Sequence, residues 1–326
     1  MPVIHYLGPV GTFSEQAAKM LGGNMIAMTP GQTPGDCSLI PQPTLARAIT
    51  AIDAPDTFAV VPYYNLIEGL IQETPDLIVE HKLIILAARQ IPIRFAIGGF
   101  VPENAGATPN SAPNIDVPVY SHPKALAQCS AFLQARFPAA TFHETTSTSQ
   151  SVRHVLDKRH GLAIARRETL ESLGVPILHT DVGNRQYARQ NYTEFLLVGR
   201  KDHRLNITLQ PAPESPIRTL IAVIPTVDRV GLLADILGQI AFFGINLLKI
   251  HSRPALADAF GPAPQMFYLE TDIAADSKEL RLCIETLDMR LAKHGESGYH
   301  PQSGAGHKVV HLLGTYPLHI HNDLMR

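Results

Sequence analysis

A proline-rich segment divides the sequence into two parts that carry different patterns. Residues 210–216 contain three prolines in seven positions, and proline stiffens a linker because its ring fixes one backbone dihedral. Before this segment, short apolar runs alternate with segments of helical period, which is the pattern of a layered α/β domain. We predict strands over residues 3–7, 58–62, 83–88, 94–97, 117–120, 161–165 and 195–198, and helices over 13–21, 124–137, 149–158 and 167–173.

The part after the linker carries a compact pattern of six elements. Leu280, Ile284 and Leu287 recur at the spacing that places side chains on one face of a helix. The order βαββαβ is that of the ferredoxin-like fold. We predict strands over residues 219–224, 246–251, 266–270 and 309–313, and helices over 230–243 and 277–291.

The composition argues against several classes of protein. The 27 Lys and Arg residues and 29 Asp and Glu residues give a net charge of −2, so we expect no nucleic-acid partner and no membrane partner. The three cysteines form no C-x-x-C pair and the histidines fit no metal motif, so we expect neither a metal nor a cofactor. No apolar run reaches the ~20 residues of a membrane span, and no signal peptide is recognisable. These features favour a cytoplasmic protein.

Three segments have the chemistry of a turn that opens a helix. Residues 8–15 read GPVGTFSE, residues 121–126 read SHPKAL, and residues 145–150 read TTSTSQ. Each offers capping hydroxyls or a proline suited to the first helical turn. Helix starts attract anions, and in an open α/β sheet they gather at the carboxyl ends of the strands. Any one segment could be only a cap, whereas three converging helix starts would suit a small dianion.

These segments belong to a set of motifs that resembles the prephenate dehydratase family. The motifs are GPVGTFSEQAA at 8–18, SHPKALAQC at 121–129, STS at 147–149, NYTEF at 191–195 and GTYP at 314–317. They occur in the family's order and cover nearly the whole chain. The resemblance implies a two-lobed, periplasmic-binding-protein-like catalytic domain over residues 1–210 with a ligand cleft between its lobes. It also implies a ferredoxin-like regulatory domain of the ACT type over 217–318, followed by a tail over 319–326.

The resemblance also implies an activity, the conversion of prephenate to phenylpyruvate with loss of carbon dioxide and hydroxide. Thr193 is then the residue expected to contact the leaving hydroxyl, by donating a hydrogen bond within a network. The two carboxylates of prephenate suit the helix starts described above. The expected substrate-binding residues are Gly11, Thr12, Phe13, Ser14, Ser121, His122, Ser147, Thr148, Ser149 and Asn191.

Two motifs depart from the family's pattern. Glu194 stands where the family has arginine after the threonine, which reverses a charge. In the family's P-I-E-N-S segment the asparagine is retained as Asn65, while the glutamate is Tyr64 and the serine is Leu66. We assign Thr193, Asn65, Tyr64 and Glu194 to the catalytic set, with a pocket that is larger and more aromatic than usual.

The C-terminal part resembles the phenylalanine-binding ACT domains of the same family. Residues 230–233 read VGLL in place of P-G-A-L, and residues 244–254 read GINLLKIHSRP, with His251 in place of a glutamate. The resemblance implies an aromatic amino acid effector and a homodimer or homotetramer formed through this domain. The expected effector-binding residues are Gly231, Leu232, Leu233, Asn246, His251, Ser252 and Arg253.

The departures leave three functions open. The first is dehydration of prephenate with feedback by an aromatic amino acid. The second is decarboxylation alone, or the dehydration of a prephenate analogue whose amine would pair with Glu194. The third is an amino-acid sensor whose catalytic lobes are silenced by Tyr64 and Glu194.

Overall fold

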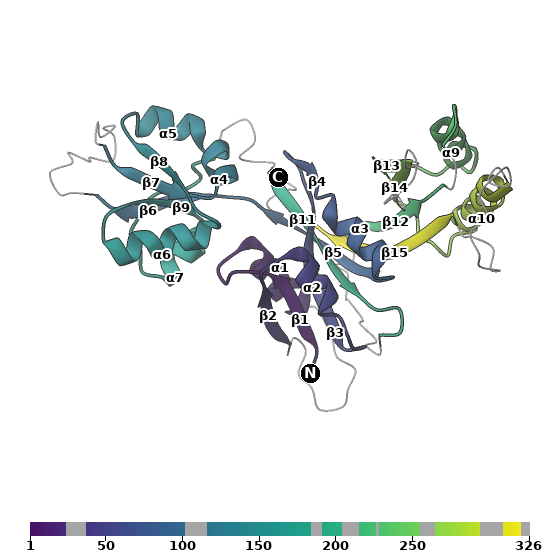
Figure 1. Cartoon of the computed structure of the whole chain (residues 1–326), viewed down its shortest axis with the longest axis horizontal. Helices are drawn as coiled ribbons and strands as arrows, with labels where there is room; N and C mark the ends of the chain where they lie inside the picture. Colours follow the sequence, from purple (N-terminus) through teal and green to yellow (C-terminus); the bar gives the residue numbers. More distant parts are fainter. Residues whose placement is uncertain are drawn as a thin grey trace, which may run out of the picture.

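The computed structural model describes residues 1–23, 37–101, 116–183, 191–203, 215–225, 228–254, 265–293 and 309–320. Residues 210–214 of the predicted linker over 210–216 lie outside these ranges. Three units follow one another along the molecule (Figure 1). Lobe 2, whose elements lie between residues 96 and 179, is at one end. Lobe 1, whose elements lie between residues 3 and 92 and over 192–199, is in the middle, and a C-terminal unit with elements between residues 217 and 319 is at the other end. The predicted architecture, two α/β lobes and a ferredoxin-like unit, is confirmed.

Lobe 1 is built from the N-terminal segment and one later strand, β11, which returns from lobe 2. Parallel strands β2, β1 and β3 continue into antiparallel β11 and β5. Their side chains pack on α1 and α2 in two buried clusters. The elements are β1 (Val3–Leu7), α1 (Phe13–Gly23), β2 (Ser38–Gln42), α2 (Leu45–Thr50), β3 (Thr57–Asn65), β4 (Gly69–Leu70), α3 (Glu73–Glu80), β5 (Ile84–Pro92) and β11 (Tyr192–Gly199).

Lobe 2 is an insertion between β5 and β11, so the chain crosses between the lobes twice. Its sheet has the order β10-β6-β9-β7-β8. The predicted helix over 124–137 is two helices that meet at Cys129, a fully buried residue in the core of this lobe. The elements are β6 (Ala96–Phe100), β7 (Pro118–Ser121), α4 (Pro123–Gln128), α5 (Ser130–Arg136), β8 (Thr141–Glu144), α6 (Thr148–Lys158), β9 (Gly161–Ala165), α7 (Arg167–Ser172) and β10 (Ile177–His179).

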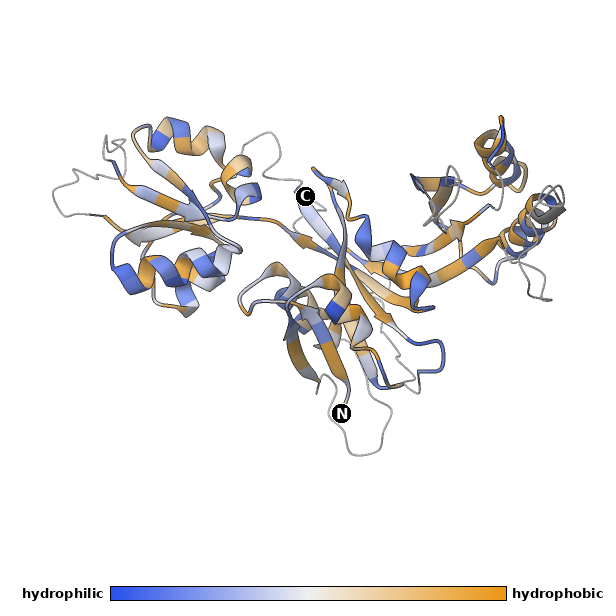
Figure 2. Cartoon of the chain, in the orientation of Figure 1, coloured by the Kyte–Doolittle hydropathy of each residue, from blue (hydrophilic) through white to orange (hydrophobic). Residues whose placement is uncertain are grey.

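The C-terminal unit has the predicted βαββαβ order, and its sheet runs β13-β14-β12-β15. Strand β15 also pairs with β5 through Leu318 and His319, so the sheets of this unit and lobe 1 are continuous. Apolar residues dominate the strands along this sheet (Figure 2). The elements are β12 (Ile217–Val223), α9 (Leu232–Phe242), β13 (Leu247–Pro254), β14 (Gln265–Thr271), α10 (Lys278–Lys293) and β15 (Val310–His319).

This pairing revises the expected boundary at the C-terminus. The tail expected from residue 319 begins inside a strand, because His319 pairs with Arg89 of β5 and is buried. Residues 321–326 lie outside the described ranges.

Candidate active site

The polar residues of lobe 1 gather at one edge of its sheet. Strands β1 and β3 are parallel, so both end at this edge, and antiparallel β11 begins there. The pairing places Thr193 of β11 directly opposite Asn65 of β3. Both residues are buried, together with the adjoining Asn191. The sheet therefore holds a hydroxyl and two amides together.

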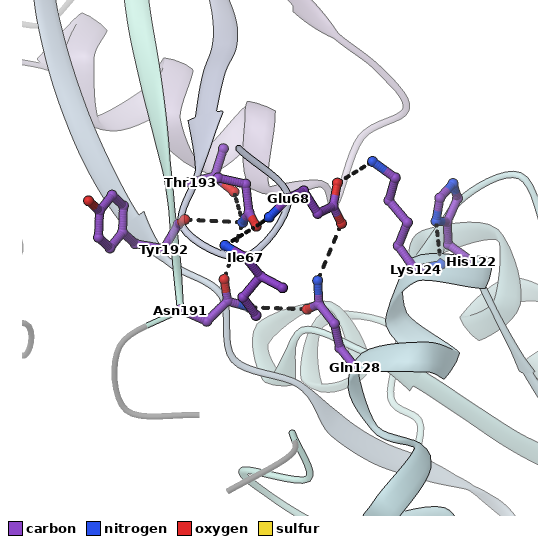
Figure 3. A network of polar contacts seen from close by, with 9 residues as sticks. Ile67, Glu68, His122, Lys124, Gln128, Asn191, Tyr192 and Thr193 are labelled. Carbon is purple, nitrogen blue, oxygen red and sulfur yellow. Dashed lines mark hydrogen bonds and ion pairs between the residues drawn. The ribbon is translucent and has the colours of Figure 1, made fainter. Parts of the chain in front are cut away.

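Hydrogen bonds fix the orientation of the Asn65 amide (Figure 3). Its Oδ1 accepts from the backbone N–H groups of Ile67 at 3.0 Å and Glu68 at 3.1 Å. Its Nδ2 donates to Thr193 Oγ1 at 3.0 Å, and it also lies within hydrogen-bond distance of Tyr192 O at 3.1 Å and Asn191 Oδ1 at 3.2 Å. A flipped amide would lose both backbone donors, so Nδ2 must face the threonine. Thr193 Oγ1 thus accepts one hydrogen bond, and its own O–H proton is left to donate elsewhere.

The network continues across the gap between the lobes. Asn191 Nδ2 donates to Gln128 Oε1 at 3.0 Å, and Gln128 Nε2 donates to Glu68 Oε1 at 3.4 Å. Lys124 forms an ion pair with the other oxygen of Glu68 (Figure 3). Gln128 and Lys124 lie one turn apart on α4, while Glu68 belongs to lobe 1. Sequence reasoning assigned no role to these three residues, although the i, i+4 spacing of Lys124 and Gln128 was a usable signal.

The first glycine-rich turn is held by groups from both lobes. Gly11 N–H donates to Glu15 Oε2 at 2.6 Å, and Glu15 N–H donates to Thr12 Oγ1 at 3.3 Å, which confirms the expected cap. From lobe 2, Thr169 Oγ1 donates to Gly11 O at 2.8 Å and Arg166 donates to Thr12 O at 3.1 Å. Burial tends to raise the pKa of Glu15, but its hydrogen bonds to Lys19 and Gly11 outweigh this and lower it. The loop is therefore held by an ionised carboxylate.

A cavity of about 570 Å³ lies between this turn and the start of α6. Ser147 caps α6 by accepting from Gln150 N–H at 3.1 Å, as predicted. Ser149 Oγ is buried at the cavity without a hydrogen-bond partner, and Arg153 adds a positive charge. The cavity is lined by residues 8–10, 41–43, 146, 147, 149, 150 and 153.

Five other predicted substrate contacts have different surroundings. Ser121 is fully buried and donates to Ile164 O at 2.7 Å, so its hydroxyl is occupied within lobe 2. His122 caps α4 by accepting from the backbone N–H of Lys124 at 3.2 Å. Phe13 packs against Phe95, with ring centroids 5.9 Å apart. Ser14 is buried on α1, and Thr148 is the first residue of α6.

Tyr64 and Glu194 lie on the other face of the sheet, away from the Thr193 network. Adjacent residues of a strand point to opposite faces, and Glu194 pairs with Tyr64 just as Thr193 pairs with Asn65. Glu194 is 0% exposed and accepts a hydrogen bond from Lys249 of the C-terminal unit at 3.3 Å. The assignment of Tyr64 and Glu194 to the catalytic set is therefore corrected. Both residues belong to the contact between lobe 1 and the C-terminal unit.

The predicted effector-binding residues do not lie together within this single chain. Gly231 and Asn246 lie at opposite ends of α9, whose 11 residues span about 16 Å. Leu232 is buried, while Leu233 and Ser252 are exposed. His251 and Arg253 instead face lobe 1: the rings of His251 and Tyr64 are 6.1 Å apart, and Arg253 forms an ion pair with Asp76 at 3.0 Å.

Within the described ranges, no group of three or more His, Cys, Asp or Glu residues could hold a metal ion. In the same ranges, no helix is long and apolar enough to cross a membrane. The structure has a cavity between two α/β lobes, which is a usual place for a small-molecule site.

Comparison with known proteins assigns this architecture to a family. The sequence profile described as prephenate dehydratase matches residues 4–203. The chain is 31% identical over 256 residues to a prephenate dehydratase of Amycolatopsis methanolica, covering 78% of this chain and 74% of that protein. It is 29% identical over 314 residues to a bifunctional chorismate mutase/prephenate dehydratase of Aquifex aeolicus (strain VF5), covering 96% of this chain and 73% of that protein. The chain belongs to the prephenate dehydratase family.

Solved structures agree with this assignment. A prephenate dehydratase from Arthrobacter aurescens, in complex with L-Phe, has a TM-score of 0.71 at 25% identity, covering 97% of this chain and 90% of that one. GqqA, described as a novel type of quorum quenching acylase, has a TM-score of 0.69 at 19% identity, with 97% and 98% covered. The second likeness shows the fold alone. The predicted family and enzyme class are confirmed.

Proposed function

We propose that this enzyme converts prephenate to phenylpyruvate, and that Thr193 assists departure of the ring hydroxyl. The bond to the ring carboxylate breaks and releases carbon dioxide, its electron pair enters the ring, and the hydroxyl leaves as the ring becomes aromatic. A hydrogen bond from Thr193 would stabilise the negative charge that develops on the leaving oxygen. The observation that carries this proposal is the Asn65–Thr193 hydrogen bond, because it leaves the threonine proton free to donate.

We place the substrate in the cavity between the lobes, along the sheet edge that also carries Thr193. Prephenate has two carboxylates, and the cavity offers the start of α6, the unpartnered Ser149 hydroxyl and the Arg153 guanidinium. Each of these groups favours an anion. The cavity volume of about 570 Å³ is within the usual range for small-molecule sites.

Dehydration is favoured over decarboxylation alone by the position of the sequence departures. Thr193, Asn65 and Asn191 keep a connected network, while Tyr64 and Glu194 lie on the opposite face of the sheet. Glu194 is paired with Lys249, so it is not free to serve as the counter-charge of an amine on an analogue.

We propose that the C-terminal unit is an ACT-type regulatory domain that pairs with a second copy and binds an aromatic amino acid. Gly231 and Asn246 are too far apart to contact one small ligand within a single chain, so a second copy would complete the site. A partner surface is supported by exposed apolar side chains. They lie on α9, just before it and on the outer face of β13: Val230, Leu233, Phe242, Leu248 and Ile250.

Sedimentation is expected to show a dimer or tetramer that L-phenylalanine stabilises. A monomer unaffected by L-phenylalanine would contradict this.

Replacing Asn65 with aspartate is expected to lower kcat by about 10- to 100-fold. The carboxylate still accepts from the N–H groups of Ile67 and Glu68, but it has no N–H to donate to Thr193. The threonine hydroxyl would then donate its proton to the introduced carboxylate and would no longer be available to the substrate. Steady-state kinetics with prephenate, beside a thermal melt, measure this; a folded variant whose kcat stays within twofold of the wild type would refute the assigned role.

A further inference from the structure

One face of β13 forms a row of contacts with lobe 1. Lys249, His251 and Arg253 alternate along this strand, and each faces a different part of the lobe. Lys249 contacts Glu194 of β11, His251 lies beside Tyr64 of β3, and Arg253 contacts residues of α3 or just before it. The C-terminal unit thereby reaches both strands that carry the Asn65–Thr193 pair.

Lys249 is the most enclosed cation of this row. Its ammonium group donates to Glu194 Oε2 at 3.3 Å and to the two oxygens of Glu270 at 3.0 and 3.3 Å. Glu194 and Glu270 are buried, and Arg218 approaches Glu270 at 3.6 Å. Burial tends to lower the pKa of Lys249, but the two carboxylates outweigh it and raise it. The lysine therefore stays charged and holds together two carboxylates that would otherwise repel each other.

The same ammonium group lies against an irregularity in the catalytic strands. Glu194 pairs with Tyr64 and Phe195 pairs with Pro62, so Tyr63 has no partner in β11 and forms a β-bulge. Lys249 Nζ is 5.5 Å from the ring centroid of Tyr63 and 4.7 Å from that of Tyr64. Bulges re-aim side chains and are frequent beside active sites. The next pair along the ladder is Thr193 with Asn65.

We infer that Lys249 is a positioning residue for the reaction: by holding Glu194 and both tyrosine rings, it fixes the bulge that sets Thr193 against Asn65. The C-terminal unit would thus supply part of the geometry of the catalytic strand. This inference rests on the proposed function, since it concerns the rate of the dehydration step. It goes beyond that function by giving a role to a residue of the other domain, adjacent to neither Thr193 nor the cavity.

The test is the kinetics of Lys249→Met, which keeps the length of the side chain and removes its charge. We expect kcat to fall about 10- to 100-fold, because displacement of a catalytic group by about 1 Å can cost this much. We expect KM to change less than threefold, because Lys249 does not line the cavity. Lys249→Arg, which restores the charge, is expected to recover much of the lost kcat. Lys278→Met, an exposed lysine on α10, is the matched control and should behave as the wild type.

The outcomes separate the two claims. An inactive wild-type protein would refute the proposed function, whereas an active wild type with an unchanged kcat in Lys249→Met would overturn only the role of Lys249. If Lys249→Met does not fold, Glu194→Gln takes its place, because it weakens the same contact without burying an unpaired charge. A kcat of Glu194→Gln within twofold of the wild type, with the fold confirmed by circular dichroism, would also overturn the inference. A lower stability with unchanged kcat would show a purely structural contact and overturn it as well.

Discussion

Replacing Thr193 with alanine is expected to lower kcat by about 10²- to 10³-fold, with little change in KM. The variant removes the single hydroxyl that Asn65 orients at 3.0 Å, and positioned proton donors contribute about 10²- to 10⁴-fold to enzymatic rates. The effect should fall on kcat because charge develops on the leaving oxygen only in the transition state. Phenylpyruvate formation, followed by its absorbance in alkali, measures the rate.

Two variants control this prediction. Thr193→Ser keeps a hydroxyl at the same position and should retain activity within about tenfold of the wild type, since it loses only a methyl group that holds the rotamer. Thr141→Ala alters an exposed threonine of β8 and should leave the rate unchanged. If Thr193→Ala is folded and turns over prephenate at the rate of the wild type, Thr193 is not the catalytic donor.

Replacing Gly314 with alanine is expected to destabilise the protein by about 3–5 kcal/mol, the cost of a severe steric conflict in a core. A Cβ at this position would lie 2.4 Å from the carbonyl oxygen of Ile85 and 3.0 Å from its Cβ. Gly314 lies in β15, the strand that continues into the sheet of lobe 1 beside β5. The added methyl would push apart the two strands that join lobe 1 to the C-terminal unit. Chemical denaturation followed by circular dichroism measures the loss.

Gly238 provides a matched glycine-to-alanine control. It lies within α9, and a Cβ there would meet no atom within 4 Å. Alanine is the better helix former, so Gly238→Ala should raise the free energy of unfolding by about 0.5–1 kcal/mol. If the two substitutions changed the free energy of unfolding equally, the predicted steric conflict between a side chain at position 314 and Ile85 would be wrong.

The interior strands of the fold could be predicted from the sequence, and so could the edge strand β13, whereas the edge strands β2, β8 and β10 could not. Buried strands such as β3 and β9 are continuous apolar runs, which the hydrophobic pattern reveals. Strands β2 and β8 end their sheets, and every residue of β8 is exposed. Such strands bury little apolar surface, so neither has a hydrophobic pattern, and β2 includes a proline, which is tolerated at an edge.

The candidate site also has features that the sequence predicts and features that it does not. The helix starts follow from local sequence, because capping spacing is a local property. Thr193 and Asn65 were singled out by the family resemblance, and their pairing across 128 positions is brought about by the folded chain. The alternation of side chains along a strand also shows that Thr193 and Glu194 cannot point to the same face of the sheet. It does not show what covers the opposite face. The partner of Glu194 is Lys249, 55 positions away in another unit, and only the folded chain brings the two together.

The central claim is that this chain removes both carbon dioxide and the ring hydroxyl from prephenate. The direct measurement is incubation of the purified wild-type protein with prephenate, with products identified by mass spectrometry and by absorbance in alkali. We predict phenylpyruvate as the product. A decarboxylated product that retains the hydroxyl, or prephenate recovered intact, would contradict the account.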